Sequence, residues 1–201
     1  MSTYPIELNL AGKRVLVVGL GAVGRRKAVG LIAAGAKVVG VDPAVDSIVD
    51  VQIYNEPYRS SHLDLITLVF AAATPEINRQ VVCDAKARGI WVNAASDPDL
   101  GDFRIPATWS DGPITLTVST SGASPALAAM LRDRAMDSIG PEAAPFAKLL
   151  KELRPLLLAK VDDPEERRRI AISWADPQWL RLWQEQGEES VRAALLRSFE
   201  G

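Results

Sequence analysis

The 201-residue sequence has little of the two residue types that most often build structural metal sites, with one cysteine and one histidine. A single cysteine, Cys83, excludes an internal disulfide, and no zinc cluster is indicated. Cys83 falls in a helical apolar pattern, which predicts a buried thiol. His62 stands in a polar stretch without ligand-type spacing, so we expect it at the surface. No serine–histidine–acid pattern is present, and we expect no resident metal.

The sequence also lacks an excess of positive charge, since 23 Lys and Arg residues face 25 Asp and Glu residues, for a net charge of −2. A nucleic-acid-binding surface needs a basic face, so we expect no nucleic-acid partner. The short cluster Arg25–Lys27 is more typical of a solvated helical turn than of a phosphate clamp. No apolar run reaches the ~18 residues of a membrane span, and the N-terminus lacks a signal-peptide pattern. We expect a cytoplasmic protein without a membrane partner.

The most informative stretch runs from Arg14 to Asp42. The apolar run 15–18 enters Gly19-x-Gly21-x-x-Gly24, a helical pattern follows until Gly35, and a second apolar run, 38–41, ends at Asp42. This strand, glycine turn, helix, strand and acid is the pattern of a dinucleotide-binding site. The alternative is a Rossmann-like domain that keeps the turn and binds nothing. The predicted cofactor-binding residues are Gly19, Gly21, Ala22, Val23, Gly24, Asp42, Ala72, Ala73 and Thr74.

Each part of that pattern has a physical role. Gly19 permits the tight turn, Gly21 lets the pyrophosphate approach the backbone, and Gly24 lets the helix lie close to the sheet. The free N–H groups at the start of the helix would face the phosphates. Asp42 could accept hydrogen bonds from the ribose hydroxyls and repel a 2′-phosphate, which predicts NAD rather than NADP as the cofactor.

Strands and helices continue to alternate up to about residue 95. Strands are predicted at 51–54, 66–73 and 90–94, with a helical turn at 60–63 capped by Ser60 or Ser61. A longer helix should begin at Pro75, with Thr74 as its N-cap. The alternation predicts an α/β fold with a Rossmann-type, doubly wound parallel sheet. The carboxyl ends of the strands should converge on one cleft, where Asp97, Asp99 and Asp102 are candidate acid–base groups.

The pattern changes after Ser96. Strands are predicted at 103–107 and 114–119, with a turn at 111–113 between them. The turn from Ser119 to Ser124 gathers hydroxyl and N–H groups that suit carboxylates or phosphates, although it could be only a well-capped helix start. Everything beyond Gly140 reads as helical, with tryptophans typical of a core or a subunit contact. We predict a Rossmann domain at 1–110, a small α+β dimerisation region at 111–140 and a helical domain at 141–201.

Four separated blocks resemble one known family. They are Tyr4–Lys27, Ala72–Val82, Gly89–Ala107 and Gly112–Ala128, in that order along the chain. The blocks include V-V-G-x-G-x-V-x-x-R-K, A-A-x-x-P-E-x-N, D-P-x-L-x-D-F-x-x-P-A and V-S-T-x-G-x-S-P-A. Together they resemble the precorrin-2 dehydrogenase family, which comprises the N-terminal module of siroheme synthase and its stand-alone relatives.

The resemblance implies an NAD-dependent oxidation of precorrin-2 to sirohydrochlorin by a homodimer, with the tetrapyrrole in a cleft between domains. In some family members it also implies iron insertion. The implied catalytic residues are Ser96 and Asp97. The implied substrate-binding residues are Asn93, Arg104, Ser119, Thr120, Ser121, Gly122 and Ser124. Thr120 also stands where some members carry a phosphorylated hydroxyl.

Ser96 departs from the family, which has an aspartate at this position. Serine is neither an anionic base nor a hard carboxylate ligand, so the departure counts against iron insertion more than against dehydrogenation. A second hypothesis is therefore a tetrapyrrole- and nucleotide-binding carrier or sensor without catalysis. A third, an unrelated NAD-dependent dehydrogenase, draws support only from the first block.

Overall fold

The computed structural model describes residues 3–200, which divide into two compact units, 3–105 and 106–200. The first unit holds a five-stranded parallel sheet in the order β3-β2-β1-β4-β5. Progression along the sheet reverses between β1 and β4, which creates the switch point where such sheets bind ligands. The strands are β1 Arg14–Val18, β2 Lys37–Val41, β3 Val51–Tyr54, β4 Leu68–Ala71 and β5 Trp91–Ala94.

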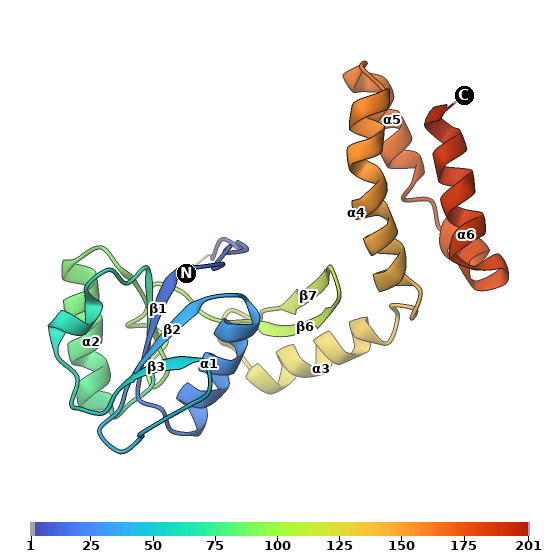
Figure 1. Cartoon of the computed structure of the whole chain (residues 1–201). Coiled ribbons are helices and arrows are strands. Elements are labelled where there is room, and N and C mark those ends of the chain that lie inside the picture. Colours follow the sequence, from blue (N-terminus) through green and yellow to red (C-terminus); the bar gives the residue numbers. More distant parts are fainter. Residues whose placement is uncertain (1–2, 201) are drawn as a thin grey trace. The chain divides into compact units, whose positions relative to one another are not determined.

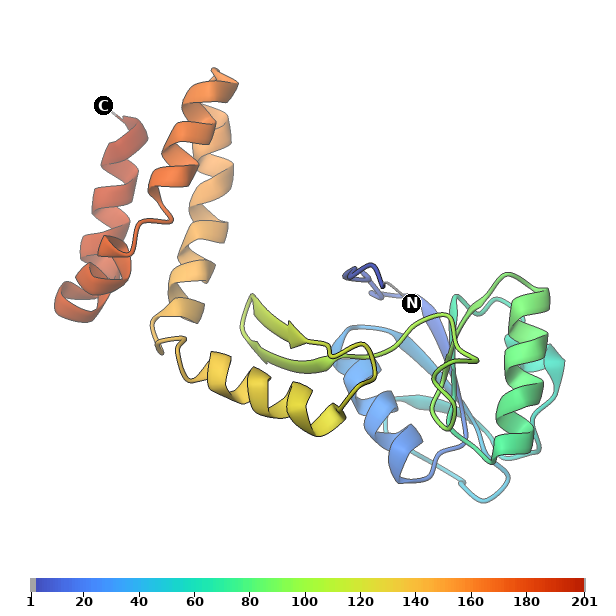
Figure 2. The ribbon, with the colours of Figure 1, turned by 180° about the vertical axis from the view of Figure 1, so that it is seen from behind.

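Helices α1 (Ala22–Ala33) and α2 (Pro75–Ala87) cover opposite faces of this sheet, as Figure 1 and the view from behind in Figure 2 show. Successive strand side chains point to opposite faces of a sheet. Because helices cover both faces of β1 and β4, their sequences are apolar without alternation. Val15 and Val17 pack with α1, and Leu16 and Val18 pack with α2. The predicted doubly wound sheet is confirmed.

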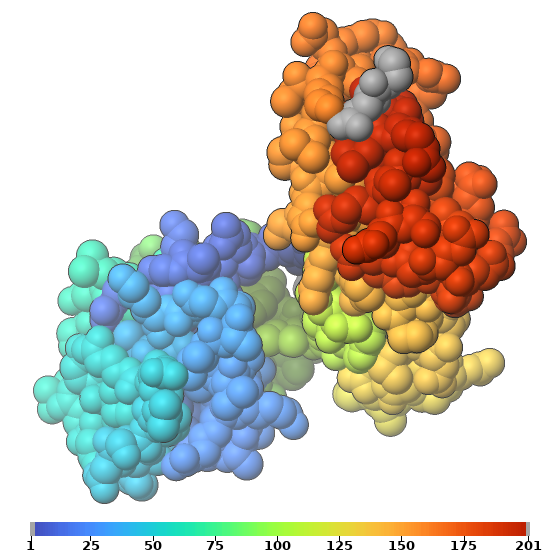
Figure 3. Space-filling model, turned by 45° about the vertical axis from the view of Figure 1, so that its right-hand side comes forward, coloured from blue at the N-terminus to red at the C-terminus, as the bar shows by residue number. Residues whose placement is uncertain are grey.

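The second unit begins with a hairpin of β6 (Ala107–Asp111) and β7 (Ile114–Val118), followed by α3 (Pro125–Met136). Three more helices follow, α4 (Ala143–Lys160), α5 (Pro164–Ser173) and α6 (Gln178–Glu200). Helix α6 is interrupted at Gly187, whose φ of 78° is not helical. Figure 3 shows α6, in red, closely packed with α4, in orange. The predicted tryptophan core is confirmed, because Trp174 is buried with Leu149, Leu153 and Leu195.

The predicted strand at 103–107 is wrong, since the strand begins only at Ala107 and pairs through to Asp111. Pro106 has no N–H to donate to a ladder. Phe103 is instead turned inward, with its ring edge-on to Phe70 at a centroid distance of 5.4 Å. The hairpin therefore places 107–110 in the second unit, and the two units divide between Ile105 and Pro106. The functional division at 110 and 140 stays a prediction.

Two burial predictions are also wrong. Cys83 is exposed, because in α2 it lies beside rather than on the face formed by Val81, Val82 and Ala85. The His62 side chain is only 6% exposed. Its Nδ1 accepts from the backbone N–H of Arg59 at 3.0 Å and its Nε2 pairs with Glu56 at 2.9 Å. His62 thus closes a capping box with Arg59 around the 3₁₀ turn η1 (Ser60–Leu63). The N-cap of this turn is Arg59, so the predicted cap at Ser60 or Ser61 is wrong.

Candidate functional site

The turn between β1 and α1 requires glycine at Gly19 and Gly24 for steric reasons within the protein. Gly19 has a φ of +87°, and a Cβ there would lie 2.5 Å from the backbone nitrogen of Ala73. A Cβ on Gly24 would lie 1.8 Å from the carbonyl oxygen of Gly19. The first glycine therefore lets the β1 and β4 turns touch, and the last lets α1 lie against the turn.

Gly21 differs from both, because neither its backbone conformation nor its packing within residues 3–200 requires a glycine. Its φ of −65° and ψ of −170° are open to any residue. Apart from its chain neighbours, a Cβ there would meet no atom of the described residues within 4 Å. Gly21 is also the N-cap of α1, and no side chain caps that helix. The N–H groups of Ala22, Val23 and Gly24 therefore begin a helix beside open space, an arrangement that suits the phosphates of a dinucleotide.

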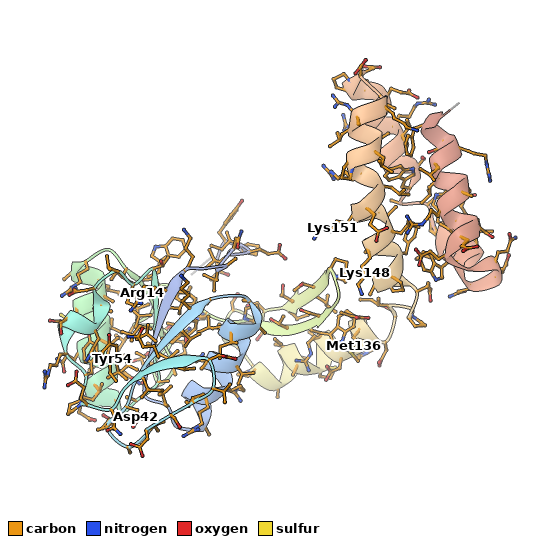
Figure 4. All side chains as sticks on the ribbon, viewed as in Figure 1. Arg14, Asp42, Tyr54, Met136, Lys148 and Lys151 are labelled. Carbon is orange, nitrogen blue, oxygen red and sulfur yellow. The ribbon has the colours of Figure 1, made fainter. Side chains whose placement is uncertain are left out.

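Asp42 follows β2 at the same edge of the sheet. Its Oδ2 accepts from the N–H of Leu20, inside the glycine turn, at 2.7 Å. Its Oδ1 accepts from the N–H of Ala44 at 2.9 Å. Each carboxylate oxygen keeps a further lone pair for a ribose hydroxyl. Figure 4 shows Asp42 and Arg14, the first residue of β1, toward opposite ends of the sheet.

The turn after β4 supplies the other half of this edge. The N–H of Ala72 donates to Val18 at 2.7 Å, so the turn continues the β1–β4 ladder. Thr74 caps α2 through Ile77, as predicted, at 3.5 Å. Sequence reasoning missed Asn78, which is 2% exposed and forms hydrogen bonds with both backbone polar groups of Ala73. An amide in the first turn of α2, four residues after its N-cap, was the available signal.

Ser96 lies just beyond β5, where its hydroxyl oxygen accepts a hydrogen bond from Asn78 Nδ2 at 2.8 Å. Asp97, its exposed neighbour, accepts from the N–H of Asp99 at 3.2 Å and otherwise faces solvent. Both residues stand at the carboxyl edge of the sheet, on the same unit as the glycine turn. Their catalytic roles stay predictions.

The remaining acids and Arg104 have partners inside the protein. Asp102 accepts from the N–H of Val92 at 3.0 Å and donates its own N–H to the same residue, so it extends the sheet edge. Asp99 pairs with Arg104 at 2.5 Å, an exposed ion pair worth little in stability. Asp102 therefore has a structural role, and Arg104 would have to exchange its carboxylate partner to contact a substrate.

Asn93 is 6% exposed, and its Nδ2 donates to the carbonyl of Phe103 at 2.9 Å. Its Oδ1 is a buried acceptor with no hydrogen-bond partner among residues 3–200. Asn93 is in register with Phe70 of β4. The observed hydrogen bond holds the segment after β5 against the strand. The contact of Asn93 with a substrate stays a prediction.

The hydroxyl-rich turn lies in the second unit, between β7 and α3. Ser124 caps α3 through Leu127 at 3.1 Å, as predicted. Ser121 and Gly122 have φ of 54° and 91°, which brings the turn back on itself. The Thr120 hydroxyl donates to the carbonyl of Ser124 and accepts from its N–H, so it is committed inside the turn. Ser119 accepts from the N–H of Ser121 at 3.2 Å.

The basic cluster at the start of α1 does not act as a unit. Arg25 donates to the carbonyl of Leu20 at 2.9 Å, and Arg26 is exposed. Lys27 turns toward the sheet, with its Nζ 5.1 Å from the centre of the Phe70 ring. Burial, with a smaller contribution from Arg26, lowers the pKa of Lys27. Arg26 is therefore solvated, as expected for this helical turn. Lys27 instead packs against the Phe70 ring.

Other hollows lie away from this edge. One of about 300 Å³, beside Lys13, Thr67 and Trp91, lies at the amino ends of the strands. Within residues 3–200, no three His, Cys, Asp or Glu side chains are grouped to hold a metal ion. In the same part of the chain, no helix is long and apolar enough to cross a membrane.

The sheet order, the glycine turn and the acid after β2 define a dinucleotide-binding Rossmann domain. The chain belongs to the family described as "Putative NAD(P)-binding", whose model matches residues 6–107. Residues 111–134 match the model of the sirohaem biosynthesis protein central domain. The cofactor is therefore a nicotinamide dinucleotide, NAD or NADP.

Relatives and a solved structure extend the likeness beyond these segments. The siroheme synthase of Tolumonas auensis is 30% identical over 198 residues, 95% of this chain and 42% of that protein. The siroheme synthase of Psychrobacter arcticus is 32% identical over 178 residues, 85% of this chain and 32% of that protein. The chain thus spans less than half the length of these relatives. The structure of SirC, a precorrin-2 dehydrogenase, shares the fold with a TM-score of 0.75 and 23% identity, over 98% of this chain and 99% of SirC.

Proposed function

We propose that this protein oxidises precorrin-2 to sirohydrochlorin, with NAD as the hydride acceptor. The observation that carries the proposal is the space at Gly21, beside an uncapped helix start, in a chain that shares the fold of SirC over nearly its whole length. A glycine that neither backbone conformation nor packing requires is explained by a ligand that passes over it. The sirohaem-type segment at 111–134 supports a tetrapyrrole as substrate.

The chain's own groups would bind and orient the reactants. When bound, NAD supplies the acceptor for the hydride that leaves the macrocycle. The N–H groups at the start of α1 would hold its phosphates, and Asp42 its ribose. The turn Ser119–Ser124 and Arg104 would donate hydrogen bonds to substrate carboxylates, and Asp97, exposed beyond β5, would accept the released proton. We do not extend the proposal to iron insertion, because Ser96 offers no carboxylate to a metal.

Asp42→Ala is expected to weaken NAD binding about tenfold and to reduce the preference for NAD over NADP. The substitution removes a carboxylate that accepts from ribose hydroxyls and repels a 2′-phosphate. Calorimetric titration of both dinucleotides into the wild type and the variant gives the two ratios. Asp162→Ala, at an exposed residue between α4 and α5, is the control. An unchanged ratio of affinities would refute the role assigned to Asp42.

A homodimer is also part of the proposal. What supports it is the apolar surface of α3, where Leu127, Met130 and Leu131 are 42%, 43% and 39% exposed. Light scattering is expected to give about twice the 21.7 kDa of one chain. Leu127→Lys combined with Leu131→Lys should reduce that mass to one chain, and a monomeric wild type would exclude the dimer.

The second candidate function is a carrier or sensor that binds both ligands without catalysis. It is favoured by Ser96, a neutral group held by Asn78 where the family has an acid. Mixing the purified protein with precorrin-2 and NAD tests both candidates, and the growth of NADH absorbance is the expected result. Absence of NADH together with tight binding of sirohydrochlorin would replace the dehydrogenase with the carrier.

A further inference from the structure

The side-chain amide of Asn78 has only one possible orientation. The N–H of Ala73 can only donate, so the Asn78 atom 2.9 Å away must be the acceptor oxygen, Oδ1. The amide nitrogen is therefore on the other side, 3.2 Å from the carbonyl of Ala73 and 2.8 Å from the hydroxyl oxygen of Ser96. Both contacts use N–H groups of Nδ2. One buried amide thus links the turn after β4 to the turn after β5.

This orientation determines what Ser96 can do. Because Nδ2 donates to it, the Ser96 oxygen accepts on that side, and its own proton is directed elsewhere. Ser96 is exposed, and among residues 3–200 no acceptor takes that proton. An aspartate at this position would receive the same Nδ2 proton but would present only lone pairs to a ligand. Serine held in this way presents a proton.

We propose that Asn78 sets Ser96 as a hydrogen-bond donor toward an acceptor oxygen of the bound reactants. That oxygen belongs either to a carboxylate of the tetrapyrrole or to the carboxamide of the nicotinamide ring. Ser96 stands beyond β5, beside the β4 turn, at the edge where parallel sheets of this order bind their ligands. Asn78 is then a positioning residue that acts through Ser96. The inference rests on the proposed function for the identity of the two ligands.

The first test compares Ser96→Ala with Ser96→Thr. Loss of the hydroxyl is expected to raise the dissociation constant of the ligand it contacts about tenfold, while threonine keeps the wild-type value. Calorimetry with NAD alone and absorbance titration with sirohydrochlorin identify which ligand is affected. Ser61→Ala, at an exposed serine in η1, is the control. Equal affinities of Ser96→Ala and the wild type for both ligands would overturn the proposal.

The second test asks whether Asn78 acts through Ser96. In N78D the new carboxylate would still accept from Ala73, but it would accept the Ser96 proton instead of donating to that hydroxyl. We expect N78D to lose affinity for the same ligand as Ser96→Ala, and the double variant N78D/S96A to lose no more than Ser96→Ala alone. Additive losses would mean that Asn78 acts independently of Ser96. Melting curves of each variant show whether the buried substitution is tolerated.

The outcomes separate this inference from the proposed function. If the wild type forms NADH from precorrin-2 and NAD, and Ser96→Ala does so with the same kcat and KM, only the donor role fails. If the wild type forms no NADH, the proposed function fails. The NAD and sirohydrochlorin titrations still report whether Ser96 donates to either ligand.

Discussion

Gly21→Val is expected to raise the dissociation constant of NAD by roughly 100-fold or more, with a melting temperature within about 2 °C of the wild type. The side chain would enter the open space beside the N-terminus of α1, where the phosphates would lie. The fold should respond little, because the φ and ψ of Gly21 suit any residue and, apart from the adjacent residues, no atom of the described chain would lie within 4 Å of the new Cβ. Calorimetry with NAD and thermal unfolding by circular dichroism measure the two quantities.

Gly30→Val is the matched control, since Gly30 lies in the same helix with the same open surroundings but away from the glycine turn. It should bind NAD as the wild type does. Wild-type affinity in Gly21→Val would show that no ligand passes over this residue. That result would also remove the observation on which the proposed function depends.

The dinucleotide edge was predictable because its requirements are local. A glycine turn between two apolar runs fixes a strand, a helix start and an acid within about 30 residues, and each part has one physical explanation. The structure adds that the three glycines differ in kind. Gly19 and Gly24 are required by contacts inside the protein, whereas Gly21 is not. A sequence pattern treats all three alike.

The rest of the candidate site depends on contacts between residues far apart in the sequence. Asn78 meets Ser96 across 18 positions, and Asp102 meets Val92 across 10. No periodicity marks such pairs, so Asp102 was grouped with Asp97 and Asp99 as an acid–base candidate although it completes the sheet edge. His62 was misplaced for a different reason. Its contacts are local, with Glu56, the backbone of Arg59 and the rings of Tyr54 and Tyr58, but they lie in an irregular segment that no periodicity marks.

The hydroxyl-rich turn shows a different limit. Its cap, Ser124, and the start of α3 at Pro125 follow from local rules and were predicted correctly. The local rules do not tell which of its hydroxyls is already bonded to the backbone of the turn. Thr120 uses both its proton and a lone pair on Ser124, while Ser119 and Ser121 remain exposed. The Thr120 hydroxyl is therefore committed inside the turn, whereas that of Ser119 accepts only from the N–H of Ser121.

Gly24→Ala is expected to destabilise the protein by about 3 kcal/mol and to lower its melting temperature by roughly 6–12 °C. One methyl group is enough, because it would lie 1.8 Å from the carbonyl oxygen of Gly19 and 2.9 Å from its carbon. Both are backbone atoms of a turn that already touches the β4 turn through Gly19, so neither can move aside cheaply. Helix α1 would have to shift away from the sheet.

The same substitution at Gly30 is expected to be neutral or to stabilise the protein by up to about 1 kcal/mol, since alanine is the better helix former and has free space there. Urea unfolding of the two variants beside the wild type gives the comparison. Equal stability of Gly24→Ala and Gly30→Ala would mean that α1 can accommodate a methyl group at position 24, and the packing argument would be wrong. In Gly24→Ala the loss of NAD binding should accompany the loss of stability, whereas in Gly21→Val the binding loss should stand alone. That contrast separates the glycine that shapes the protein from the glycine that leaves room for its ligand.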